Sequence, residues 1–160
     1  MPESLGKKFE RNLSAQFEEK GFCYDRLKDD MSGFKGSTNI CDFTVFHKGK
    51  LFYLECKSIR HGTFNYRLLR DNQYFGLLKK SDIKDVYAGV LLWFIDFDIT
   101  VFIPIKYIRS QKLLDVKSFS HNDIPAMCTI LKGTKKRVFF DYDLRDAFDS
   151  IVKLGDSYGY

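Results

Sequence analysis

The residues from Cys41 to Lys57 constrain the fold most strongly, because they read as two strands joined by a tight turn. Phe, Val, Tyr and Leu are frequent in both halves of this stretch, and these residues favour strands. The segment Lys48-Gly49-Lys50 between the halves is polar, and its glycine permits a tight turn. The stretch therefore predicts a β-hairpin.

Three charged residues of this hairpin are predicted to share one face. Side chains alternate between the two faces of a strand, so Glu55 and Lys57 point the same way. Leu54 and Cys56 point to the opposite face. The turn folds Asp42, on the preceding strand, back toward Glu55. One face of the sheet is therefore expected to carry two carboxylates and an ammonium group.

This trio suits a metal site that acts on phosphate. Two clustered carboxylates repel each other, so they share a proton or bind a cation. Oxygen ligands of this kind suit Mg²⁺ or Mn²⁺, which also accept phosphate oxygens as ligands. Lys57 can orient or help to deprotonate an attacking water and can stabilise charge that develops on phosphate. The alternative is an ordinary solvated strand face, since Glu-x-Lys is common there, but an Asp on the adjoining strand favours the metal site.

The composition fits one globular domain over residues 1–160. The net charge of +5 at pH 7 permits a nucleic-acid partner but does not demand one. The four cysteines show no metal-ligand spacing, and we interpret them as reduced structural thiols, which fits a cytoplasmic protein. The chain opens without an apolar signal-peptide core, and its longest apolar run, Val86 to Ile95, is too short to span a bilayer. We therefore expect no membrane partner.

Hydrophobic patterns predict the remaining elements. Ser4 is expected to cap a first helix that ends at Gly21 and buries Leu5, Phe9, Leu13 and Phe17. Further along, the patterns predict a polar loop over 25–39, a helix over 71–80, a strand over 86–94 covered on both faces, its hairpin partner over 99–103, a short helix over 105–112, a loop over 118–134, a strand over 138–140 and a last helix over 144–154. The helix over 71–80 is expected to turn Tyr74, Phe75, Leu77 and Leu78 inward and to point Gln73 back at the charged trio.

Basic residues at several places are candidate contacts for a nucleic-acid backbone. In the segment over 60–70, Arg60 and Arg67 can hold phosphates and Tyr66 can stack on a base, with Arg70 at its end. The other candidates are Lys7, Lys8 and Arg11 in the first helix, Lys35 in the polar loop, and the cluster Lys135, Lys136 and Arg137. An ordinary solvated surface is the alternative for each group, and a loop that packs its own aromatic residues is the alternative for 60–70.

The order of helix, hairpin with Asp and Glu-x-Lys, helix and strand resembles the PD-(D/E)XK nuclease superfamily over roughly the first two thirds of the chain. Within that superfamily it looks most like the RecU-type Holliday-junction resolvases of Gram-positive bacteria and their phages. The resemblance is carried by Gly6-Lys7-Lys8-Phe9-Glu10, by Asp42-Phe43, by Glu55-Cys56-Lys57, and by Phe64-Asn65-Tyr66-Arg67-Leu68 followed by Gln73. Two features depart from the family: the loop over 25–39 is shorter than its usual stalk, and Asn72 stands where a His often precedes the glutamine.

The resemblance implies an α/β fold with a restriction-endonuclease-like core, in which helices flank a central mixed sheet. It implies that Asp42 and Glu55 bind Mg²⁺ or Mn²⁺ with the carbonyl of Cys56, and that Lys57 positions the attacking water. Glu10 and Gln73 would assist at the edge of the site. It also implies a metal-dependent endonuclease that acts as a homodimer and makes paired nicks in a four-way DNA junction. The alternatives are a restriction- or repair-type nuclease on duplex DNA and a non-catalytic DNA-binding module with the nuclease fold.

Overall fold

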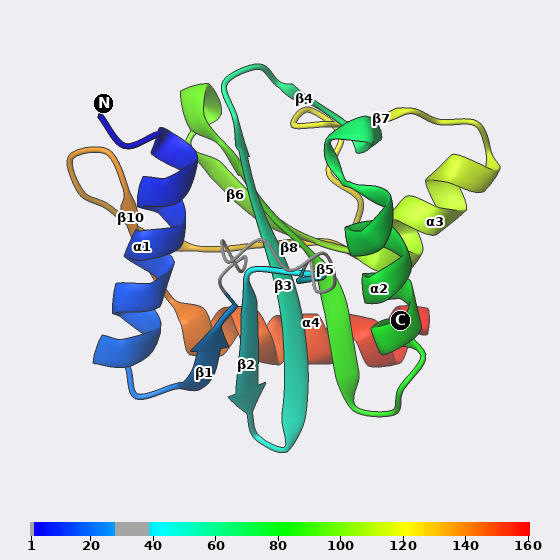
Figure 1. Cartoon of the computed structure of the whole chain (residues 1–160), viewed down its shortest axis with the longest axis horizontal. Coiled ribbons are helices and arrows are strands. Elements are labelled where there is room, and N and C mark those ends of the chain that lie inside the picture. The colour runs from blue at the N-terminus through cyan, green and yellow to red at the C-terminus, as the bar shows by residue number, and fades with distance from the viewer. Residues whose placement is uncertain (1, 28–38) are drawn as a thin grey trace, which may run out of the picture.

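The computed structural model describes residues 2–27 and 39–160 and is built around a mixed sheet of six strands (Figure 1). β3 and β5 run parallel, and every other neighbouring pair of this sheet is antiparallel. The strands follow the order β1 (Cys23–Arg26), β2 (Phe43–His47), β3 (Lys50–Ile59), β5 (Val86–Phe94), β6 (Ile99–Pro104) and β8 (Thr129–Ile130). Two small ribbons pair β4 (Thr63–Asn65) with β7 (Ser118–Ser120) and β9 (Gly133–Lys135) with β10 (Phe140–Tyr142).

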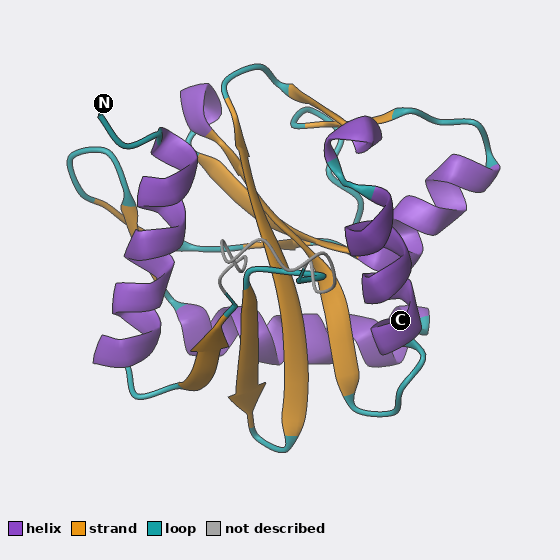
Figure 2. Ribbon diagram, viewed as in Figure 1, coloured by secondary structure: helices purple, strands orange, loops and turns teal. Residues whose placement is uncertain are grey.

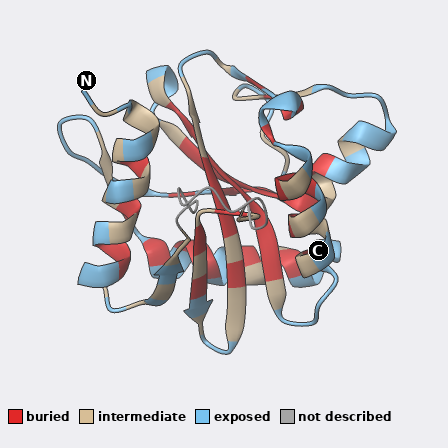
Figure 3. Ribbon diagram, viewed as in Figure 1, coloured by how far each residue is buried: buried red, intermediate tan, exposed pale blue. Residues whose placement is uncertain are grey.

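Helices cover both faces of the central sheet (Figure 2). Buried residues of α1 (Leu5–Glu19) and α4 (Leu144–Tyr158) pack on one face, and those of α2 (Asp71–Ser81) and α3 (Ile105–Leu113) pack on the other. β5 is buried along almost its whole length, as expected for a strand with a helix layer on each side (Figure 3). The predicted fold class, a central mixed sheet flanked by helices, is confirmed.

The predicted hairpin is formed by β2 and β3. Phe43 pairs with Leu54, and the pair of His47 with Lys50 closes the hairpin. The two turn residues, Lys48 and Gly49, have φ angles of 49° and 77°. This left-handed conformation matches the twist of a two-residue hairpin turn and suits glycine.

The first helix also agrees with its prediction. The hydroxyl of Ser4 accepts a hydrogen bond from the backbone N–H of Lys7 at 3.3 Å, and Gly21 beyond the helix has a φ of 75°. The helix comes close to the hairpin near its own start, where a Cβ at Gly6 would lie 3.3 Å from the hydroxyl of Ser58. This close approach places the start of α1 beside the C-terminal end of β3.

The last third of the chain departs from the prediction. The expected loop over 118–134 contains β7, β8 and β9, and β8 pairs with β6 to become the sixth strand of the sheet. The strand expected over 138–140 is displaced to Phe140–Tyr142, and the last helix continues to Tyr158. Strands of two or three residues are too short to show an alternating pattern, so their partners decide where they form.

A second departure concerns α2. The sequence predicts that Phe75 points inward, but its side chain is 62% exposed, and the buried residues of the helix are Gln73, Tyr74, Leu77 and Ser81. None of the helices in the described part of the chain is long and apolar enough to cross a membrane.

Candidate active site

The five residues predicted as catalytic line one open cavity of about 290 Å³. Asp42, Glu55 and Lys57 come from the hairpin, Glu10 from α1 and Gln73 from the first turn of α2. The structure therefore brings these residues together, while their catalytic roles remain proposals. The other lining residues are Asn39, Cys41, Cys56, Leu68 and Arg70.

Asp42 ends the ladder between β2 and β3. Its backbone N–H donates to the carbonyl of Leu54 at 3.0 Å, and its carboxylate Oδ2 accepts the N–H of Cys56 at 2.7 Å. A side chain thus takes the place of a strand carbonyl as the partner of this N–H. β3 continues to Ile59 without β2 beside it. The carboxylate is therefore fixed where the hairpin opens into the cavity.

Glu55 is 3% exposed and is held by two donors. Its Oε1 accepts a hydrogen bond from Nε2 of Gln73 at 2.7 Å and lies 2.9 Å from Nζ of Lys57. Its Oε2 is buried and has no hydrogen-bond partner among the described residues. A buried oxygen without a partner is costly, so this atom is a natural ligand for a cation.

The carboxyl groups of the cavity hold their protons more tightly than in water. Burial and the nearby charge of Glu55 raise the pKa of Asp42 to about 7, although the N–H of Cys56 and the charge of Lys57 oppose this shift. Burial also raises the pKa of Glu55, against the effect of Lys57. The pKa of Glu10 is raised by burial and by Asp42. Negative charge is thus under-compensated here, which favours a bound cation.

The donor set fits Mg²⁺ or Mn²⁺. Asp42 and Glu55 offer two hard carboxylate oxygens to a cation. The described residues contain no larger group, of three or more His, Cys, Asp or Glu side chains, that could hold a metal, so the protein would supply only these two carboxylates. Mg²⁺ is often held by one or two carboxylates and keeps water or phosphate oxygens as its other ligands, so two carboxylates suffice. The thiol of Cys56 packs in the core below α1, away from this role. Its carbonyl as a further ligand stays a prediction.

Gln73 and Glu10 are each tied to a second residue. Oε1 of Gln73 accepts the backbone N–H of Arg70 at 3.0 Å, so the amide is fixed at both ends and its nitrogen is directed at Glu55. Oε2 of Glu10 accepts a hydrogen bond from Arg26 at 3.3 Å. Sequence reasoning missed this contact, because it placed Arg26 in the polar loop over 25–39, whereas Asp25 and Arg26 belong to β1. Residues 28–38 of that expected loop lie outside the described part of the chain.

Of the predicted DNA-binding residues, one lines this cavity, and several others belong to elements that contribute a residue to its lining. Arg67 and Arg70 are exposed, and Arg70 lines the cavity itself. Lys7 and Arg11 are exposed on α1, with Arg11 paired to Glu3 at 2.5 Å, while Lys8 is half-buried. Their contact with DNA remains a prediction.

Another predicted basic group, Lys135 to Arg137, lies at the connection between β9 and β10, a ribbon beside α1. Lys135 is the last residue of β9, Lys136 and Arg137 follow it, and β10 lies next to α1 in Figure 1. The carbonyl of Phe140 accepts hydrogen bonds from the side chains of Asn12 and Gln16 at 3.2 and 2.8 Å, which ties this ribbon to the helix. Lys135 is paired with Asp98 at 2.5 Å, and Arg60 with Asp96 at 3.2 Å. Lys35 lies outside the described residues.

The prediction that Tyr66 stacks on a base is wrong. Its side chain is only 4% exposed, and its ring packs edge-on against Phe64 at 6.2 Å between centroids. The segment from β4 into the short helix η1 (Tyr66–Leu68) uses its aromatic residues to fill the core below α2 and α3. Its one arginine, Arg67, is exposed.

No family model matches the sequence, and a comparison with curated proteins gives no match. Among solved structures, the chain is similar to Hjc of Archaeoglobus fulgidus, described as "a Holliday junction resolvase from an archaeal hyperthermophile". The TM-score is 0.47 and the sequence identity is 20%, over 63% of this chain and 78% of that chain. The likeness concerns the fold. The narrower resemblance to RecU-type resolvases stays a prediction.

Proposed function

We propose that this chain is a divalent-metal-dependent DNA endonuclease that hydrolyses phosphodiesters in four-way junctions as a homodimer. One observation carries the nuclease part of the proposal: Asp42, Glu55 and Lys57 meet in a single open cavity, where Oε2 of Glu55 has no partner among the described residues. The junction and the homodimer rest on the sequence resemblance.

The residues of the site have distinct tasks in this proposal. Asp42 and Glu55 would hold Mg²⁺ or Mn²⁺, which when bound neutralises charge on the phosphate and lowers the pKa of water. Lys57 places a positive charge 2.9 Å from Oε1 of Glu55, where it can hold the attacking water and stabilise the charge that develops on the phosphate. The N–H of Cys56 and the amide of Gln73 fix the two carboxylates in place.

The surroundings of the site suit a polyanion. Arg70 borders the cavity, Arg67 is exposed three residues before it in the chain, and Lys7 and Arg11 are exposed on α1, the helix that carries Glu10. Phosphate contacts of this kind supply affinity and position the backbone without reading the bases. We therefore expect binding that weakens steeply with salt and depends little on base sequence.

The test compares a synthetic four-way junction with a linear duplex of the same sequence, each incubated with the protein in Mg²⁺ and in EDTA. We expect paired, symmetric nicks in the junction alone, and only in Mg²⁺. Equal cutting of the duplex would retain the nuclease and discard the junction as its substrate. Tight binding without cutting in any divalent metal would overturn the enzyme and leave a DNA-binding module.

A further inference from the structure

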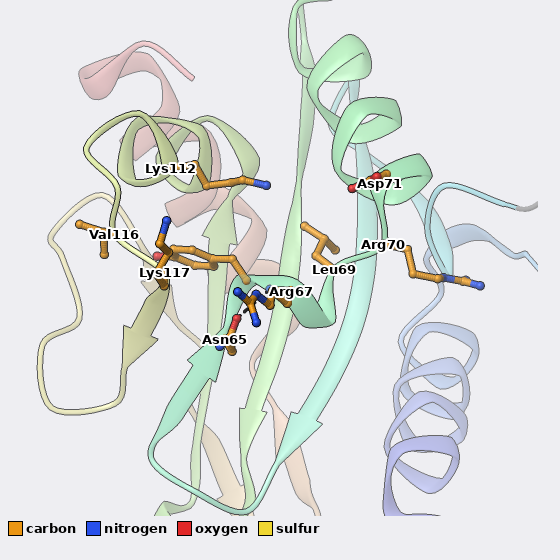
Figure 4. Close-up of a pocket in the computed structure, with 9 residues that line it drawn as sticks. Asn65, Arg67, Leu69, Arg70, Asp71, Lys112, Val116 and Lys117 are labelled. Carbon is orange, nitrogen blue, oxygen red and sulfur yellow. Dashed lines mark hydrogen bonds between the residues drawn. The ribbon is translucent and has the colours of Figure 1, made fainter.

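A second cavity of about 360 Å³ adjoins the carboxylate cavity (Figure 4). Four of the side chains that line it are basic, namely Arg67, Arg70, Lys112 and Lys117, and Asp71 is the acidic one. Lys112 and Lys117 have no part in the proposed function, and Arg67 enters it only as an exposed cation near the site.

The fold brings these cations together from distant parts of the sequence. Arg67 belongs to η1, Lys112 to the last turn of α3, and Lys117 to the segment that follows α3. The backbone N–H of Tyr66 donates to the carbonyl of Lys117 at 2.9 Å, which holds the two segments side by side. Nζ of Lys112 lies 4.1 Å from the centre of the Tyr74 ring, within the range of a cation–π contact.

The charge of this cavity is incompletely balanced. Lys117 is paired with the exposed Asp115, and Asp71 contributes one negative charge to the lining. Arg67, Lys112 and Lys117 are all exposed at its rim. Cations that share one concave surface attract an anion, and phosphate is the anion for which Arg and Lys are the usual protein donors.

The two cavities share a wall. Along the chain from Arg67 to Arg70, Leu68 lines the carboxylate cavity, Arg67 and Leu69 line the second cavity, and Arg70 lines both. In Figure 4, Arg70 extends away from Lys112 and Lys117. A ligand with phosphates in succession can therefore engage both cavities across this short segment.

We propose that the second cavity binds a backbone phosphate of the same DNA strand whose neighbouring phosphodiester lies at the carboxylate site. Lys112, Lys117 and Arg67 make the contacts, and α3 with the residues after it acts as a strand-positioning element. This inference rests on the proposed function and deepens it, because it adds the direction in which the bound strand leaves the cleavage site.

The test uses Asp42→Asn as the parent, so that bound DNA is not cut. The double variant Lys112→Gln/Lys117→Gln removes two cations, and Lys153→Gln removes one exposed cation on α4, which packs on the opposite face of the sheet. The dissociation constant of each protein for DNA is measured against salt concentration. The logarithm of the association constant falls linearly with the logarithm of the salt concentration, and each lost phosphate contact makes this fall shallower by about one. We therefore expect the absolute slope to be smaller by about two for the double variant and unchanged for Lys153→Gln.

The outcomes separate this inference from the proposed function. If the parent binds no DNA, both are overturned. If the parent binds DNA and the double variant keeps the parent's slope, only the inference is overturned. A parallel titration with inorganic phosphate tests whether the cavity binds a free phosphate compound instead of a DNA phosphate. Phosphate binding that is lost in the double variant, together with an unchanged salt slope for DNA, would assign the cavity to a small ligand and overturn the contact with the DNA strand.

Discussion

Asp42→Asn is expected to lower the rate of DNA cleavage by about three orders of magnitude or more, because it removes one of the two charged oxygen ligands of the proposed metal. Asn keeps an oxygen that can accept the N–H of Cys56, now 2.7 Å from Oδ2, so the end of the hairpin should stay intact. Single-turnover cleavage in Mg²⁺ measures the effect. Asp123→Asn, at an exposed position away from the cavity, should cleave at the wild-type rate. Equal rates for the two variants would contradict the assignment of Asp42.

The same substitution should stabilise the metal-free protein at neutral and higher pH. The pKa of Asp42 is raised from 3.8 to about 7, so its proton favours the folded state, and this contribution is lost as the pH rises through that interval. In a chelator, the free energy of unfolding of the wild type should therefore fall relative to Asp42→Asn between these pH values. Urea unfolding across this range measures it, and parallel pH profiles for the two proteins would contradict the raised pKa.

Phe148→Ala is expected to lower the free energy of unfolding by about 3–5 kcal/mol. Phe148 of α4 is 3% exposed, and its ring lies 4.6 Å from Phe52 of the hairpin, 5.4 Å from Phe22 and 6.2 Å from Phe17 of α1, between centroids. Phe148 therefore packs α4 against the hairpin and α1, the elements that carry most of the site residues.

Urea unfolding of Phe148→Ala should be compared with that of Phe75→Ala. Phe75 is also a helical phenylalanine, but it is 62% exposed, so its loss should change the free energy of unfolding by about 0.5 kcal/mol or less. Similar losses for the two variants would mean that α4 does not pack on the sheet as described.

The hairpin and its charged face could be predicted from the sequence because the relevant signals are local. A period of two places Glu55 and Lys57 together, and the turn at Gly49 brings Asp42 opposite Glu55. Gln73 was predictable for a similar reason, since the first turn of a helix that follows the hairpin points back toward it.

Other features depend on contacts between distant segments and have no local signal. β8 is a strand because it pairs with the outer edge of β6, which has no other neighbour on that side among the described strands. Tyr66 and Arg67 are adjacent in a polar and aromatic segment, and only packing against α2 and α3 decides that the ring is buried and the guanidinium exposed. Lys112 and Lys117 meet Arg67 only in the folded chain, so the second cavity could not be read from their spacing.

The central claim is that the two carboxylates and Lys57 form a metal-dependent hydrolytic site. Single-turnover cleavage of labelled junction DNA by the wild type and by Lys57→Ala, each in Mg²⁺ and in EDTA, tests it most directly, with DNA binding measured in parallel. We predict cleavage by the wild type in Mg²⁺ and none in EDTA, and a rate lower by about 10²–10⁴-fold for Lys57→Ala with DNA binding largely retained. Cleavage in EDTA, or a wild-type rate for Lys57→Ala, would contradict the claim.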